Sequence, residues 1–170
     1  MGIVSFFKEA GEKLFGRKET EAAATAAPSA PDPAAARARV DELNKKAGDA
    51  IAAYIATQNL SADGLSVSFD GATSNVTVAG IAPDQATKEK IVLCCGNVEG
   101  VAQVNDLMTV AQPADESQFH TVARGDTLSA IAKKFYGNAN TYMKIFEANK
   151  PMLKHPDKIY PGQLLRIPPA

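Results

Sequence analysis

Few residues in this chain have the types and spacing that chemistry requires, and they do not form a catalytic set. His120 and His155 are the only histidines, and neither stands in an HxH or HExxH pattern that favours a metal site. Cys94 and Cys95 could bind a soft metal together with a histidine, but cysteines on the apolar face of a helix are more often core residues. The carboxylates are scattered, as at Asp63, Glu99, Asp126 and Asp157. We therefore expect no enzyme.

The segment from Gly96 to Val101 could do a different kind of chemistry, because it follows the C-terminus of a predicted helix. Carbonyl groups at a helix C-terminus lack partners and carry the negative end of the helix dipole. Gly96 and Gly100 allow the backbone to turn carbonyls inward. Convergent neutral carbonyls suit a weakly hydrated cation such as K⁺, whereas Ca²⁺ prefers carboxylates, of which this loop has only Glu99. A helix cap followed by a tight turn would use the same glycines, so both interpretations stay open.

The elements that must position this loop lie in residues 37–112. Apolar residues at helical spacing predict a long amphipathic helix, and alternating apolar and polar residues predict a hairpin that is buried on one face. The predicted order is a helix ending near residue 58, strands at 65–69 and 76–78, a helix opened by Pro83-Asp84, and a strand at 101–107. We expect an α-β-β-α-β unit with a three-stranded mixed sheet and two helices.

This unit is similar to a BON domain. The resemblance rests on the hairpin end Val76-x-Val78-x-Gly80 and on the later run Gly100-Val101-x-x-Val104-Asn105-Asp106. BON domains have been linked to binding of phospholipids or other ligands and are not known as catalysts, so the resemblance implies a binding role.

Residues 119–168 form a second predicted unit, a βααβ arrangement. Leu128, Ile131, Ala132 and Phe135 share one helical face, with Asp126 or Thr127 as the N-terminal cap and Gly137 as the C-terminal cap. The unit resembles a LysM domain over its whole length. The matching segments are Val122-x-x-Gly125-Asp126-Thr127-Leu128-Ser129, Ile145-x-x-x-Asn149 and Ile159-Tyr160-Pro161-Gly162-Gln163.

The N-terminal region is predicted as an amphipathic helix at residues 1–16, followed by an Ala/Pro-rich linker at 17–36. The helix could dock on the rest of the protein, lie on a membrane surface or bind a partner, and a disordered start is a further alternative. Residues 113–118 are expected as a short hinge between the two units. The apolar face of the predicted helix consists of Ile3, Phe6, Phe7, Ala10 and Leu14.

Composition narrows the partners and the compartment. The net charge of −1 over 170 residues provides no basic field for nucleic acid. The two adjacent cysteines cannot easily form a disulfide with each other, which favours a reducing compartment. Charges from Lys8 onward interrupt any signal-peptide core, and no segment approaches the roughly 18 apolar residues of a membrane span. We expect a cytoplasmic protein with no transmembrane segment.

The two units and the N-terminus together resemble a bacterial family of small cytoplasmic BON–LysM proteins that bind potassium. The segments that match are Phe7-Lys8-Glu9-Ala10-Gly11-Glu12-Lys13-Leu14, Gly96-Asn97-Val98-Glu99-Gly100-Val101 and Tyr142-x-Lys144-Ile145-Phe146-Glu147-Ala148-Asn149. The resemblance implies a monomeric sensor or buffer for potassium stress, in which K⁺ docks the N-terminal helix on the BON domain and compacts the protein. It also implies a K⁺ shell of backbone carbonyls from Phe7, Ala10, Gly96, Val98 and Val101.

Two alternatives to potassium binding stay open. A LysM domain implies binding of N-acetylglucosamine-containing glycans such as peptidoglycan, although the expected cytoplasmic location opposes it. A membrane-associated scaffold could use the BON domain and the amphipathic N-terminus. The glycan alternative assigns its site to Gly125, Asp126, Thr127, Leu128, Lys158 and Ile159.

Overall fold

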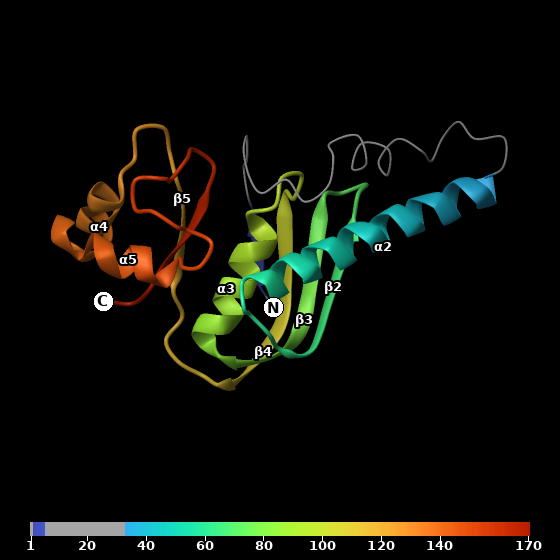
Figure 1. Ribbon diagram of the computed structural model, residues 1–170, viewed down its shortest axis with the longest axis horizontal. Helices are drawn as coiled ribbons and strands as arrows, with labels where there is room; N and C mark the ends of the chain where they lie inside the picture. The colour runs from blue at the N-terminus through green and yellow to red at the C-terminus, as the bar shows by residue number, and fades with distance from the viewer. Residues whose placement is uncertain (1, 6–32) are drawn as a thin grey trace.

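The structure is a computed structural model that describes residues 2–5 and 33–170. Figure 1 shows two units side by side, a sheet covered by helices and a smaller unit toward the C-terminus. The BON-like unit consists of β1 (Gly2–Ser5), α2 (Pro33–Thr57), β2 (Asp63–Asp70), β3 (Asn75–Asp84), α3 (Gln85–Gly96) and β4 (Gln103–Gln112). The LysM-like unit consists of β5 (Gln118–Thr121), α4 (Leu128–Tyr136), the 3-10 helix η1 (Ala139–Thr141), α5 (Tyr142–Ala148) and β6 (Leu164–Ile167).

The sheet of the BON-like unit has the strand order β1-β4-β3-β2 and is mixed. Strands β3 and β4 run parallel, and the other neighbours run antiparallel. Helices α2 and α3 pack on one face and contact each other, so the inward side chains of Phe69, Val76, Val78 and Val104 are buried beneath them. The predicted order of elements, the three-stranded mixed sheet and its two helices are confirmed, and β1 adds a fourth strand.

Helix α2 lies close to β2 because of a glycine. Ala47, Ile51 and Ile55 repeat every four residues and are buried toward the sheet. At Gly48, between the first two of these, a Cβ atom would stand 2.8 Å from the backbone oxygen of Val67. The helix therefore needs glycine at this contact. Its first residue is Pro33, so the last residues of the segment expected as linker, 17–36, belong to α2.

The predicted N-terminal helix is corrected for its four described residues. Gly2–Ser5 forms β1, which pairs antiparallel with β4 from Gly2↔Asp106 to Ser5↔Gln103. Without β1, this edge of β4 would leave backbone N–H and C=O groups unpaired, and the β-branched pair Ile3-Val4 favours an extended chain. The rest of the predicted helix, residues 6–16, lies outside the described residues.

The LysM-like unit has the predicted βααβ order, with η1 placed before the second helix. Strands β5 and β6 pair antiparallel, and α4 begins after Thr127, whose side-chain oxygen accepts a hydrogen bond from the N–H of Ala130 at 3.1 Å. Gly137 ends α4 in the left-handed conformation at φ 72°. Thr127 and Gly137 therefore confirm the predicted caps, whereas Asp126 serves the loop before the helix.

Helix α3 is buried on nearly every side. Gln85, Glu89 and all residues from Ile91 to Gly96 are buried, although a helix on a sheet normally exposes one face. Contacts with β6 account for the second buried face, and Leu164 of β6 belongs to the core of the BON-like unit. The LysM-like unit is therefore docked on α3.

The two docked units carry opposite charges. Residues 33–118 contain six basic and eleven acidic residues, a net charge of −5, and residues 119–170 contain eight basic and three acidic residues, a net charge of +5. Opposite charge favours the docked arrangement at low ionic strength and is screened by salt. Any titration with a salt therefore needs a control at equal ionic strength.

Candidate functional site

The loop from Gly96 to Val101 turns sharply at the end of α3. The N–H of Asn97 donates to the carbonyls of Leu93 and Cys95, and the N–H of Val98 donates to Cys95 O at 3.3 Å. Gly100 has a φ of 89°, which other residues adopt with strain, and the N–H of Val101 then donates to Val98 O at 3.3 Å. The tight turn expected from the two glycines is therefore present. The Val98 carbonyl keeps a second lone pair, which leaves the cation interpretation compatible with this geometry.

The loop lies beside the turn of the β2–β3 hairpin. The carbonyl of Ser74 accepts hydrogen bonds from Ala102 N at 2.8 Å and from Gln103 N at 3.4 Å. In the next residue, the side-chain oxygen Oδ1 of Asn75 is buried and has no hydrogen-bond partner in the part of the chain that the structure describes. A buried acceptor without a donor is costly, and a cation satisfies such an oxygen as well as a donor does. The neutral oxygens around this loop therefore fit a monovalent cation.

Two of the five carbonyls in the predicted potassium shell lie outside the described residues, those of Phe7 and Ala10. Gly96, Val98 and Val101 are described and are all buried. Ser5, the last described residue before the gap, pairs with Gln103, two residues after Val101. Strand β1 therefore ends at the same end of the sheet as the loop.

The side chain of Asn97 connects the loop to the LysM-like unit. Its Nδ2 donates to Leu164 O at 3.1 Å, and its Oδ1 accepts from Leu164 N at 3.0 Å. The residue is buried, with 4% of its surface exposed. Sequence reasoning treated Asn97 only as part of a loop motif. The signal that could have revealed it is a polar side chain within the apolar run 91–101, since a polar group there needs a partner.

A buried ion pair joins the two units beside this contact. Arg166 Nε donates to Glu89 Oε2 at 2.5 Å, and Glu89 Oε1 accepts from Gln85 Nε2 and from the N–H of Ser117, both at 2.8 Å. Burial alone would raise the pKa of Glu89, but the hydrogen bonds from Gln85, Ser117 and Arg166 outweigh it and hold the pKa below its usual value. Burial and the charge of Arg166 lower the pKa of the adjacent Lys90. The pair leaves no local signal in the sequence, because its members are 77 residues apart.

The LysM-like unit has an open groove of about 400 Å³ at the residues of the glycan alternative. The N–H of Ala123 donates to Asp126 Oδ2 at 2.9 Å, and His120 Nε2 lies 3.1 Å from the same oxygen. The Ala123 N–H and then His120 hold the pKa of Asp126 below its usual value. Gly125 and Lys158, also assigned to this alternative, do not line the groove. Its lining residues are Asp126, Thr127, Leu128, Ser129, Tyr142, Pro156, Asp157 and Ile159.

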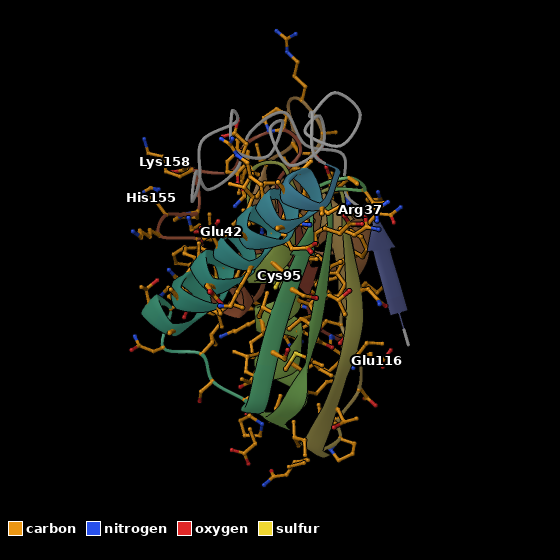
Figure 2. The ribbon with its side chains drawn as sticks, turned by 90° about the vertical axis from the view of Figure 1, so that its right-hand side faces the viewer. Arg37, Glu42, Cys95, Glu116, His155 and Lys158 are labelled. Carbon is orange, nitrogen blue, oxygen red and sulfur yellow. The ribbon has the colours of Figure 1, made fainter. Side chains whose placement is uncertain are left out.

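The cysteines and the second histidine are placed as ordinary structural residues. Cys94 and Cys95 are unbridged and fully buried, and burial raises the pKa of the Cys95 thiol, which disfavours the thiolate that binds metals. Figure 2 shows Cys95 inside the molecule, whereas His155 and Lys158 stand at its outer edge. In residues 2–5 and 33–170, no three His, Cys, Asp or Glu side chains gather into a candidate metal site. None of the helices described is long and apolar enough to cross a membrane.

Comparison with known families identifies the two units. A BON domain model matches residues 41–112, and a LysM domain model matches residues 120–168. The chain therefore combines a BON domain with a LysM domain.

Comparison with curated proteins narrows this class. The chain is 47% identical over 168 residues to the potassium binding protein Kbp of Escherichia coli O6:H1, and the alignment covers 99% of each protein. It is 37% identical over 75 residues to an uncharacterized protein of Deinococcus radiodurans, covering 42% of this chain and 29% of that one. The uncharacterized protein YqbP of Bacillus subtilis is 41% identical over 58 residues, covering 29% of this chain and 26% of its own. The chain belongs to the family of the potassium binding protein Kbp.

Proposed function

We propose that this chain is a cytoplasmic, monomeric potassium-binding protein without catalytic activity. The observation that carries the proposal is the identity of 47% to a potassium binding protein, which extends over 99% of both chains and thus includes the loop at Gly96–Val101. The neutral oxygens around that loop support a monovalent rather than a divalent cation, because divalent ions prefer carboxylate ligands.

The proposed shell consists of backbone carbonyls. Gly96, Val98 and Val101 would supply three of them from the end of α3 and the following turn. Phe7 and Ala10 would supply two more from the segment that follows β1. Backbone carbonyls are neutral, so the site would hold the ion by dipoles alone and would compete weakly for Ca²⁺ or Mg²⁺.

Potassium binding would favour the state in which the N-terminal segment is docked on the BON domain. An ion that binds only one of two states shifts the equilibrium toward that state by its differential affinity. The proposed ligands belong to segments that are distant in sequence, so the ion would hold the N-terminal segment against the BON domain and make the protein more compact. We infer a sensor or buffer in potassium stress, since no turnover is involved.

The direct test is isothermal titration of potassium-free protein with KCl, with NaCl at matched ionic strength as the control. Small-angle scattering would be recorded on both end states. We expect saturable heat with KCl alone and a smaller radius of gyration. Equal responses to the two salts would count against the proposal, because they would report screening between the oppositely charged units.

A pair of glycine variants tests the loop. Gly100→Pro replaces a φ of 89° by about −65°, which the turn cannot accommodate, and should abolish potassium binding. Gly64→Pro is the matched control, because Gly64 has a φ of 62° and is the second residue of β2, at the opposite end of the sheet. Unchanged potassium affinity in a folded Gly100→Pro variant would exclude the loop.

Glycan binding is a second candidate, favoured by the groove at Asp126, Thr127 and Ile159 in a domain that matches LysM. Titration with N-acetylglucosamine oligomers, monitored by tyrosine fluorescence, would test it. Tyr142 lines the groove and would report occupancy. Saturable binding that Thr127→Tyr blocks by filling the groove would support this candidate.

A further inference from the structure

Strand β6 is met by two asparagine side chains along the edge that β5 leaves free. Among the described residues, the two-stranded sheet consists of β5 and β6, so one edge of β6 has no described strand beside it. Asn149 donates to Arg166 O at 2.8 Å and accepts from Arg166 N at 2.8 Å. Asn97 makes the same pair of bonds two residues earlier, at Leu164. Each asparagine thus takes the place of a paired strand residue.

The two asparagines differ in where they come from. Asn149 follows α5 and belongs to the LysM-like unit itself, so its bonds to β6 are internal to that unit. Asn97 follows α3 and reaches β6 from the BON-like unit. Both are buried, with 1% and 4% of their surface exposed. Of the bonds made by these two asparagines, separation of the units would therefore break only those of Asn97.

The bonds of Asn97 restrict the backbone of the loop. Its N–H is fixed to the last turn of α3, and its side chain is fixed to β6. The carbonyl of Gly96 belongs to the peptide group that includes the Asn97 N–H, and the next peptide group leads to Val98. Rotation about the Asn97 backbone would change the direction of the Gly96 carbonyl relative to the turn that begins at Val98, so a fixed side chain limits the direction that this proposed ligand can take.

We propose that Asn97 is a positioning residue through which docking of the LysM-like unit orients the cation loop. This inference rests on the proposed potassium site, and it assigns to the LysM-like unit a part in ion affinity without contact to the ion. Coupling between two equilibria is reciprocal. Docking therefore strengthens potassium binding, and potassium binding strengthens docking.

The test compares Asn97→Ala with Asn149→Ala in the full chain. Each variant removes one asparagine from the same edge of β6, so the two are closely matched. Loss of the Asn97 bonds should weaken potassium binding roughly tenfold, as expected for two buried hydrogen bonds. Asn149→Ala should lower the melting temperature of the LysM-like unit and leave potassium affinity within about twofold. Titration calorimetry measures the potassium affinities. Small-angle scattering in sodium and in potassium measures the radius of gyration, which reports whether the two units are docked.

Several outcomes would overturn the proposal. A folded Asn97→Ala variant with wild-type potassium affinity would show that the loop does not need the bond. An equal loss of affinity in Asn149→Ala would show that only general stability matters. Should Asn97→Ala not fold, Asn97→Ser keeps a polar group that is too short to reach β6, and the same two readings apply.

The proposed function and this inference fail in distinguishable ways. Wild-type protein that binds no potassium would end both, and the sodium scattering data would still report whether Asn97 holds the units together. Wild-type protein that binds potassium with an unaffected Asn97→Ala variant would end only the inference. Reciprocity provides a second measurement of the coupling. Potassium should reduce the radius of gyration less in Asn97→Ala than in the wild-type protein.

Discussion

Helices α3 and α4 differ in how much of their surface is buried. Helix α4 buries Leu128, Ile131 and Ala132 on one face and exposes its lysines to solvent. Helix α3 buries residues all around its axis, including the charged Glu89. Helix α4 belongs to the core of one unit, whereas helix α3 is shared by the two units. A helix without an exposed face therefore marks the place where the second unit of this protein docks.

The polar contacts follow the same division. The LysM-like unit closes its own strand edge with Asn149, whereas the BON-like unit contributes Asn97 and Glu89 to its neighbour. A change at a residue whose contacts stay within the LysM-like unit, such as Asn149, should therefore affect that unit alone. A change at α3 should affect both units.

The largest effect is expected where the two units share a buried charge pair. Glu89→Ala or Arg166→Ala leaves an uncompensated buried charge, which should lower the free energy of unfolding by about 3–5 kcal/mol. Guanidinium denaturation followed by circular dichroism measures it. The double variant Glu89→Met/Arg166→Met is the control and should be nearly neutral, because it removes both charges. A loss below about 1 kcal/mol in the single variants would instead indicate a solvent-exposed pair.

A smaller effect is expected from Gly48→Ala in α2. The added Cβ atom would stand 2.8 Å from Val67 O, so the helix must shift and the variant should lose roughly 1–3 kcal/mol. Ala53→Ser on the exposed side of the same helix is the control. Thermal melts should show the loss in the BON-like unit, and the comparison of units would be contradicted if the LysM-like unit melted earlier by the same amount.

The two helix caps provide a matched pair. Thr127 caps α4 by accepting from Ala130 N, and Asp84 caps α3 by accepting from Thr87 N at 2.7 Å. Alanine at either position should cost about 1 kcal/mol. Amide hydrogen exchange should rise only in the LysM-like unit for Thr127→Ala, and in both units for Asp84→Ala. If Asp84→Ala raised exchange only in the BON-like unit, α3 would not be shared between the units.

Much of this fold could be predicted from the sequence because the information is local. The alternation at Val76 and Val78, the cap at Thr127 and the left-handed Gly137 each depend on residues close in the chain. The N-terminal helix was predicted from the same kind of periodicity, and it is corrected at Gly2–Ser5 because the free edge of β4 is a feature of the tertiary structure.

The candidate site was less accessible to prediction. Backbone carbonyls carry no side-chain signature, so the loop at Gly96–Val101 was assigned by resemblance as well as by its glycines. Asn97 and Leu164 are 67 residues apart, and their contact exists only after the two units dock. No periodicity within either unit encodes such a pair. Within the BON-like unit, the docking of the second unit is visible only as the burial of α3 on all sides.

The smallest predicted effect at neutral pH is the dependence of docking on the ionisation of Glu89, which becomes visible only in acid. The folded-state pKa of Glu89 lies below its unfolded value, so its contribution is fully present above the unfolded pKa of about 4.5 and is lost as the pH falls through the lower folded pKa. The docked units should therefore separate progressively below that pH, seen as a growing radius of gyration in small-angle scattering.

Glu89→Gln separates this effect from general acid unfolding. The variant should dock more weakly at neutral pH, and its docking should not change with pH through the carboxylate window. Asp126 also has a depressed pKa, but it lies within the LysM-like unit, so Asp126→Asn should leave the acid-induced separation in place. A separation centred above the ordinary glutamate pKa of about 4.5 would contradict the assignment, since a depressed pKa moves the midpoint to lower pH. The acid midpoint thus tests whether Glu89 on α3, rather than a residue internal to either unit, holds the two units together.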